Sequence, residues 1–111
     1  MIVEVGGNVV ALSTPGADGQ VQTLLQIILD WLVAGRSLPE AVAAPRWRSG
    51  NNRLLVEAGH PARADLIARG HDVVDVAAGD MRFGAITAAG VWQGATFALP
   101  DWRPMTWAGV A

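Results

Sequence analysis

The chain has 111 residues, a formal net charge of −2, 51% hydrophobic and 16% charged residues, and a mean hydropathy of +0.30. This length is near that of a common domain and predicts one domain over residues 1–111. The charged fraction is low for a soluble monomer, in which charged residues make up about a quarter. We therefore expect a partner to cover part of the apolar surface.

Several functional classes are excluded by composition. All eight basic residues are arginines spread along the chain, so no basic face offers the phosphate contacts that nucleic-acid binding needs. The chain has no cysteine, which excludes disulfides and thiolate metal sites. The apolar stretch 21–33 is too short to span a bilayer, and the N-terminus does not have the pattern of a signal peptide, so any signal would lie upstream. We expect a protein that binds neither nucleic acid nor a membrane.

The N-terminal part predicts a hairpin that leads into a helix. Runs of β-branched residues at 2–5 and 8–13 flank Gly6-Gly7, a pattern typical of a two-residue hairpin turn. After a tight turn, residues 20–34 repeat apolar side chains with helical period over a broad arc, which predicts a helix covered on most sides.

The caps of the helices are also suggested by sequence. Asp18 is a candidate N-cap of the first helix, and Gly35 stands where a glycine commonly follows a helix end. Ser37 and Glu40 match a capping box, which opens a short second helix that must end before Pro45.

The second half alternates strands and one helix. It predicts a strand at 53–57, a helix at 61–69, a strand at 72–77, and a second hairpin with strands at 83–88 and 91–99 around Ala89-Gly90. The tail 101–111 shows no clear period. The order β-β-α-α-β-α-β-β-β predicts an α+β fold, with an antiparallel sheet that carries helices on one face.

Several segments, taken in order, point to a known family. They are a Thr-Pro-Gly turn running into a Leu-Gln-rich helix at 14–32, a short helix ending in Ala-Pro-Arg at 37–46, Leu-Val-Glu at 55–57, the segment 66–73, Phe-Gly at 83–84, and the strand 90–96. Each is weak alone, but their order and spacing resemble the C-terminal part of the small subunit of γ-glutamyltranspeptidases. The resemblance covers about residues 2–100.

The resemblance implies an N-terminal-nucleophile hydrolase, an αββα sandwich whose precursor cleaves itself to expose a threonine. That threonine attacks a γ-glutamyl amide, its own α-amine serves as base, and the acyl group passes to water or an amino acid. Cephalosporin acylases and poly-γ-glutamate-processing enzymes share the arrangement, so the substrate class does not follow from the fold. We expect no cofactor and no metal. The sequence leaves the location open, and only the resemblance suggests a periplasmic or extracellular one.

The functional residues that the resemblance places in this chain are Gly16 and Ala17, whose backbone N–H groups correspond to the oxyanion hole. The family's nucleophile, in a Thr-Thr-His context, and its substrate-gripping serine pair precede the part that this chain covers. The family has glycine where this chain has Ala17, and its terminal Asp-Pro-Arg is replaced here by Pro-Asp-Trp. If the turn needs a positive φ, alanine costs about 1–2 kcal/mol there.

The alanine leaves two interpretations open. An oxyanion donor is worth about 3–4 kcal/mol in the transition state, and alanine keeps the N–H, so the turn can still work. Alternatively, the parent protein is a divergent member with altered activity. A third interpretation is structural, because Gly16 and Ala17 could simply begin a helix.

Other candidate residues favour structural roles. His60 and His71 are single histidines that we expect to cap or line loops, without a third metal ligand. Asp72, Asp75 and Asp80 form only a loose acidic cluster, because the first two point to opposite faces of a strand.

The arginines and tryptophans outside the turn also predict packing rather than chemistry. Arg46 and Arg48 are expected in a structural or interface role. Trp92, Trp102 and Trp107 are expected to fill a sheet edge or meet a partner chain.

Two functional hypotheses follow. In the first, this chain is a fragment of a γ-glutamyl-transferring or -hydrolysing enzyme, with the N-terminal remainder of that enzyme as partner and a γ-glutamyl small molecule as substrate. The fragment is then inactive alone, since its threonines at 14, 23, 87, 96 and 106 are internal. In the second, the chain is a non-catalytic interaction module, an interpretation motivated by Met1 and Ala17. In both, an uncovered sheet face predicts a homo-oligomer in isolation, most simply a twofold dimer.

Overall fold

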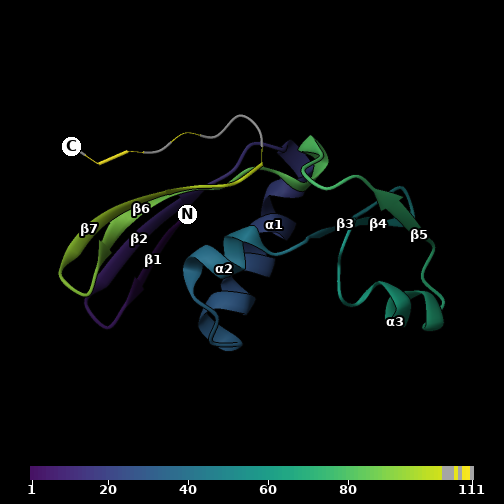
Figure 1. Cartoon of the computed structure of the whole chain (residues 1–111), viewed down its shortest axis with the longest axis horizontal. Coiled ribbons are helices and arrows are strands. Elements are labelled where there is room, and N and C mark those ends of the chain that lie inside the picture. Colours follow the sequence, from purple (N-terminus) through teal and green to yellow (C-terminus); the bar gives the residue numbers. More distant parts are fainter. Residues whose placement is uncertain (104–106, 108, 111) are drawn as a thin grey trace.

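A computed structural model describes residues 1–103, 107, 109 and 110 (Figure 1). The strands are β1 (Ile2–Val5), β2 (Asn8–Ser13), β3 (Trp47–Gly50), β4 (Arg53–Glu57), β5 (Val73–Val76), β6 (Thr87–Trp92) and β7 (Ala95–Pro100), and the helices are α1 (Gln20–Ile28), α2 (Leu38–Ala43) and α3 (Arg63–Ala68). A four-stranded sheet has the order β1-β2-β6-β7, and a three-stranded sheet has the order β3-β4-β5. The predicted α+β class is confirmed.

The first hairpin and the three predicted helices are confirmed in position. The first helix is not covered on most sides, however, because Val21, Leu25 and Val33 are 76%, 49% and 75% exposed. Gly6 and Gly7 form the turn between β1 and β2 with φ of 54° and 81°, a conformation that glycine adopts without strain. The first helix comprises α1 and a π turn, η2 (Leu29–Val33), and Gly35 follows it with φ of 79°. Ser37 and Glu40 form the predicted capping box at the start of α2.

The predicted N-cap Asp18 is wrong. The chain enters α1 through a 3-10 turn, η1 (Ala17–Gly19), so Asp18 lies inside that turn. Gly19 occupies the N-cap position of α1, and no side chain caps the helix there. The preceding turn therefore decides where the helix begins, and a local capping rule cannot detect it.

The three-stranded sheet contains one strand, β3, that the sequence did not predict. It turns into β4 through Asn51 and Asn52, whose φ values of 52° and 58° lie in the left-handed region that asparagine tolerates. The pairing of β4 with β5 is parallel, because α3 crosses over between them. The sheet therefore adds one parallel pair to an otherwise antiparallel fold.

The free edge of β3 is covered by side chains from α1. The Gln26 amide donates to the Trp47 carbonyl (2.8 Å) and accepts from its N–H (2.9 Å). One helical turn earlier, Gln22 does the same with Ser49, at 3.1 and 2.7 Å. Two glutamines thus take the place of a neighbouring strand and fix α1 against the second sheet.

The second hairpin is displaced from its prediction. Its turn lies at Gln93-Gly94, with φ of 51° and 80°, and not at Ala89-Gly90. Residues Met81–Phe83 form a 3-10 turn, η3. Gly90 lies inside β6, where a Cβ atom would come within 2.1 Å of the Val9 carbonyl oxygen of β2. This glycine permits a close strand approach, so its presence does not indicate a turn.

Helices α1 and α2 cover one face of the four-stranded sheet (Figure 1), as predicted. The main core lies between them and contains Val10, Leu12, Ile27, Trp31, Leu38, Ala41, Val42, Ile86 and Ala88. The opposite face carries the exposed apolar side chains of Ile2, Val9 and Val91. No helix in the described part of the chain is long and apolar enough to cross a membrane.

A buried network of four charged side chains joins the two sheets. Arg46 follows α2, Glu57 ends β4, and Asp101 and Arg103 follow β7. Each side chain is at most 2% exposed. Arg46 Nη2 lies 2.7 Å from Asp101 Oδ2, Arg103 Nη1 lies 2.9 Å from Asp101 Oδ1, and Arg103 Nε lies 2.9 Å from Glu57 Oε2. Buried charges persist only when paired in this way.

The two arginines also satisfy backbone carbonyls. Arg46 donates to the carbonyls of Val42 (2.8 Å) and Phe83 (2.9 Å). Arg103 donates to those of Val42 (3.1 Å) and Ala44 (3.0 Å). The arginines therefore complete the hydrogen bonding of the C-terminal end of α2.

The two carboxylates accept backbone N–H groups. Asp101 accepts from Ile86 N at 2.9 Å, next to the start of β6. Glu57 accepts from Arg46 N and from Gly79 N, both at 2.9 Å. The two carboxylates thus hold the backbone at Arg46, Gly79 and Ile86 close to the buried network.

Replacing Asp101 by asparagine should lower the free energy of unfolding by about 3–5 kcal/mol, because it leaves buried arginines without full compensation. Burial raises the pKa of Asp101, but the Arg46 charge, the Ile86 N–H and Arg103 outweigh it and hold the pKa below the ordinary 3.8. As the pH falls, Asp101 therefore takes up a proton more readily in the unfolded state than in the folded one. Its stabilisation is complete above about pH 4 and is lost at lower pH.

Urea denaturation between pH 3 and 7 measures the stability lost in Asp101→Asn and the pH dependence of that loss. The exposed ion pair of Asp65 with Arg69 provides the control, since Asp65→Asn should cost about 0.5 kcal/mol or less. Equal losses in the two variants would contradict a stabilising role for the network.

Candidate functional site

The turn between β2 and α1 carries the two candidate N–H groups, those of Gly16 and Ala17. Gly16 has φ of 127° and is half-buried, while Ala17 has φ of 45° and is exposed. Neither N–H donates a hydrogen bond to any described residue. Two adjacent free donors at a helix entry can bind an anion or a developing oxyanion.

Ala17 adopts the conformation that glycine would adopt more easily. Its φ of 45° is in the left-handed region, so the alanine is strained by about 1–2 kcal/mol. The N–H group is unaffected by this strain.

The turn packs against the segment 83–86. Thr14 Oγ1 accepts from Ala85 N at 3.1 Å and donates to the Pro15 carbonyl at 2.9 Å. Thr23, on α1, donates to the Phe83 carbonyl at 3.3 Å.

A cation lies beside the turn. The Arg48 guanidinium would be 3.1 Å from a Cβ atom at Gly19, and it donates to the Arg82 carbonyl at 3.2 Å. Among the described residues, it is the one arginine without a carboxylate within 4.0 Å. Its uncompensated charge favours anions near the turn.

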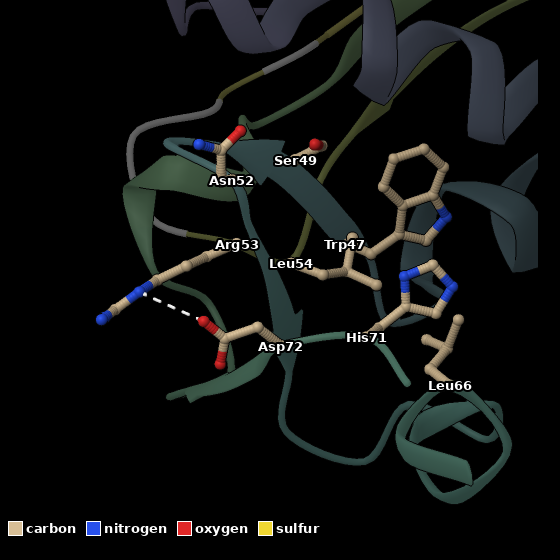
Figure 2. Close-up of a pocket in the computed structure, with 8 residues that line it drawn as sticks. All are labelled: Trp47, Ser49, Asn52, Arg53, Leu54, Leu66, His71 and Asp72. Carbon is tan, nitrogen blue, oxygen red and sulfur yellow. Dashed lines mark ion pairs between the residues drawn. The ribbon is translucent and has the colours of Figure 1, made fainter. Parts of the chain in front are cut away.

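A separate cavity of about 610 Å³ lies on the three-stranded sheet. Figure 2 shows Trp47, Leu54, Leu66 and His71 gathered on one side of it. The ion pair between Arg53 and Asp72 (3.5 Å) lies on the other side. The cavity therefore holds a histidine, as expected for a loop-lining residue, but its one carboxylate is already paired.

The acidic cluster is divided into separate ion pairs. Asp75 pairs with Arg63 at 2.5 Å, and Asp80 pairs with Arg82 at 2.9 Å. His60 Nδ1 accepts from Ala62 N at 3.1 Å, so it caps a turn as predicted. The residues that the structure describes contain no group of three metal-ligating side chains.

Of the three tryptophans singled out in the sequence, Trp92 and Trp102 contact the rest of the fold, and Arg46 has a structural role. Trp92 contacts Trp31 with ring centroids 5.2 Å apart, and Trp102 donates its indole N–H to the Ala43 carbonyl at 3.0 Å. Trp107 is exposed. The structural role predicted for Arg46 is confirmed by its place in the buried network.

A second, apolar cavity of about 840 Å³ lies beside the Trp31–Trp92 pair, between η2 and β7. The described residues that line it include no nucleophile beside a base.

Sequence patterns missed Glu57, Asp101 and Arg103, and also the contact of Thr14 with Ala85. The one local signal was Glu57 at the end of an apolar strand, where a charge must be paired if the strand is buried.

Comparison with known proteins identifies the family. The family model described as Gamma-glutamyltranspeptidase matches residues 1–108. The chain belongs to the gamma-glutamyltranspeptidase family. Its fold is that of the N-terminal-nucleophile hydrolases, to which the solved gamma-glutamyltranspeptidases belong.

One curated relative is the Acylase ACY 1 proenzyme of Pseudomonas sp. (strain SE83), which is 38% identical over 113 residues, or 98% of this chain and 20% of the relative. The chain therefore spans about a fifth of the length of the curated relatives it matches.

Solved structures of this family have the same fold as the chain. A gamma-glutamyltranspeptidase from Helicobacter pylori is 26% identical, with a TM-score of 0.77 over 93% of this chain and 59% of that one. The transpeptidase enzyme CapD of Bacillus anthracis shares the fold at 18% identity, with a TM-score of 0.81 over 99% of this chain and 69% of that one.

Replacing Ala17 by glycine should stabilise the chain. The change removes about 1–2 kcal/mol of left-handed strain, and glycine's greater freedom in the unfolded state offsets about 0.5–1 kcal/mol of that gain. We expect a net gain of about 0.5–1 kcal/mol, measured as a rise in Tm of a few degrees.

Ala64→Gly, at an exposed position in α3, is the matched control and should cost about 1 kcal/mol. A loss of similar size for Ala17→Gly would show that residue 17 carries no strain.

Proposed function

We propose that this chain is the C-terminal part of the small subunit of an enzyme that transfers or hydrolyses γ-glutamyl groups, and that the N–H groups of Gly16 and Ala17 form its oxyanion hole. The observation that supports the proposal most is the pair of free N–H groups at the β2–α1 turn. Family membership and the neighbouring Arg48 charge add support, because the substrate of such an enzyme carries a carboxylate.

In the proposed reaction, the absent part of the enzyme supplies the nucleophilic threonine. Its α-amine takes the hydroxyl proton while the oxygen attacks the γ-carbonyl carbon. The carbonyl oxygen becomes negative and accepts hydrogen bonds from the N–H groups of Gly16 and Ala17. When the tetrahedral species collapses, the amide C–N bond breaks, the amine leaves with the proton, and the acyl group passes to water or to an amino acid.

The isolated chain should be inactive, because it lacks that nucleophile. Thr14 and Thr23 are engaged in hydrogen bonds to backbone carbonyls. Thr87 and Thr96 are internal strand residues, and Thr106 lies outside the described residues. A threonine inside the chain has no free α-amine to act as its base.

The experiment compares the full-length gene product with the 111-residue chain. After self-cleavage, the full-length protein should hydrolyse a γ-glutamyl anilide, while the isolated chain should release no aniline. Because one relative is an acylase, a glutaryl anilide, which lacks the α-amine, tests the acyl specificity.

Faster turnover of the glutaryl compound would contradict the γ-glutamyl assignment.

The strained Ala17 also supports a second candidate, a non-catalytic interaction module of the same fold. A full-length product that folds but neither self-cleaves nor turns over either anilide would favour that module.

The partner that we propose is the remainder of the parent enzyme, docked on the exposed face of the four-stranded sheet. Val9 and Val91 are adjacent across β2 and β6 on this face, and each is at least 40% exposed. Ile2, Ala11 and Ala89 extend the same apolar surface. Stacked sheets bury such faces against each other.

In isolation, two copies of the chain should pair through this face. Sedimentation at micromolar concentration should show a dimer, since an uncovered apolar face of this kind is rarely stable in water. The double variant Val9→Glu and Val91→Glu should shift the population to monomer, whereas Ile67→Glu, at a similarly exposed position on α3, should not. A purely monomeric wild-type chain would contradict the pairing.

A further inference from the structure

We propose that Thr14 is the positioning residue of the oxyanion turn, because its hydroxyl fixes the peptide unit that carries the Gly16 N–H. The inference rests on the proposed function of that turn. It adds a residue whose side chain would not itself touch the substrate.

The argument begins with peptide geometry. The carbonyl of Pro15 and the N–H of Gly16 belong to one planar peptide unit, and the described chain contains no cis peptide bond. In a trans unit the C=O and N–H bonds point in opposite directions. Thr14 Oγ1 donates to the Pro15 carbonyl at 2.9 Å, so this hydrogen bond also sets the direction of the Gly16 N–H.

The next peptide unit is fixed in the same manner. The carbonyl of Gly16 accepts from Gly19 N at 2.9 Å, and this carbonyl shares its plane with the N–H of Ala17. Both proposed donors are therefore oriented through carbonyl oxygens on the opposite side of their peptide units. The first depends on a side chain, and the second on the backbone of η1.

The Thr14 hydroxyl is itself held from outside the turn. Its oxygen accepts from Ala85 N at 3.1 Å. This contact requires Gly84, because a Cβ atom there would lie 2.4 Å from Thr14 Oγ1, and the φ of Gly84 is 73°. A larger residue at position 84 would push the two segments apart.

The segment 83–86 is in turn anchored to the buried charge network. Arg46 donates to the Phe83 carbonyl at 2.9 Å, and Ile86 N donates to Asp101 at 2.9 Å. The position of Ala85 N is thus fixed on both sides. The chain of contacts runs from the network through Ala85 and Thr14 to the Pro15–Gly16 peptide unit, so the turn is oriented before a substrate arrives.

The test uses Thr14→Val, which removes the hydroxyl at nearly constant shape, and Thr14→Ser, which keeps it. In the self-cleaved full-length protein, Thr14→Val should lower kcat by about 10- to 100-fold with little change in KM, because an interaction of the transition state is weakened. Affinity for a boronate that mimics the tetrahedral species should fall in parallel. Thr14→Ser should stay within about threefold of wild type.

Thr23→Val is the matched control. It removes a hydrogen bond to the same segment, at the Phe83 carbonyl, but leaves the turn's own peptide units untouched. It should lower stability about as much as Thr14→Val without the same fall in kcat. Equal kcat values for Thr14→Val and wild type, or equal losses in the two valine variants, would overturn the proposal.

A second measurement separates this inference from the proposed function. In the 111-residue chain, the amide NMR shift of Gly16 should move in Thr14→Val and stay close to wild type in Thr14→Ser, while that of Ala17, held by η1, should move less. An inactive full-length wild type with this NMR pattern would refute the enzyme assignment and retain the positioning role. Unchanged shifts in Thr14→Val would refute the positioning role even in an active enzyme.

Discussion

The buried pairing of Arg46 and Arg103 with Asp101 and Glu57 is the constraint on which the rest of the structure depends. Four charges withdrawn from water are tolerated only because each meets an opposite charge and backbone groups at hydrogen-bonding distance. The network joins the end of α2, the end of β4 and the residues after β7. It thereby fixes how the three-stranded sheet meets the four-stranded one, and it anchors the segment that lies against the turn.

The turn at Gly16 and Ala17 combines two opposed requirements. N–H groups that donate to no described residue favour anion binding, but they contribute no intramolecular hydrogen bond to stability. The alanine adds strain at a φ of 45°. Such a conformation persists only where surrounding contacts determine it, and here Thr14, η1 and the segment 83–86 provide those contacts. The strain at Ala17 therefore occurs where contacts from outside the turn hold its backbone in place.

Local signals predicted the local parts of this fold, and the tertiary parts required the structure. The capping box of Ser37 and Glu40 was predictable because its partners are three residues apart. The role of Gly90 was not, because the neighbour that excludes a side chain comes from another strand. Likewise, Arg103 and Glu57 are 46 residues apart, and neither shows its partner in sequence. The turn was predictable from Pro15 and Gly16, and the role suggested for its N–H groups came from family resemblance, while the contacts that orient it are tertiary.

The two glutamines of α1 have a consequence for how this chain can associate. Gln22 and Gln26 occupy the backbone groups of Trp47 and Ser49 with four hydrogen bonds, so an incoming strand would have to displace all of them to extend the sheet at β3. Growth by strand addition, the usual route from an open edge to fibrils, is blocked at this position. A one-residue slip of α1 would also break the same contacts. The glutamines thus protect the edge and lock the helix in register.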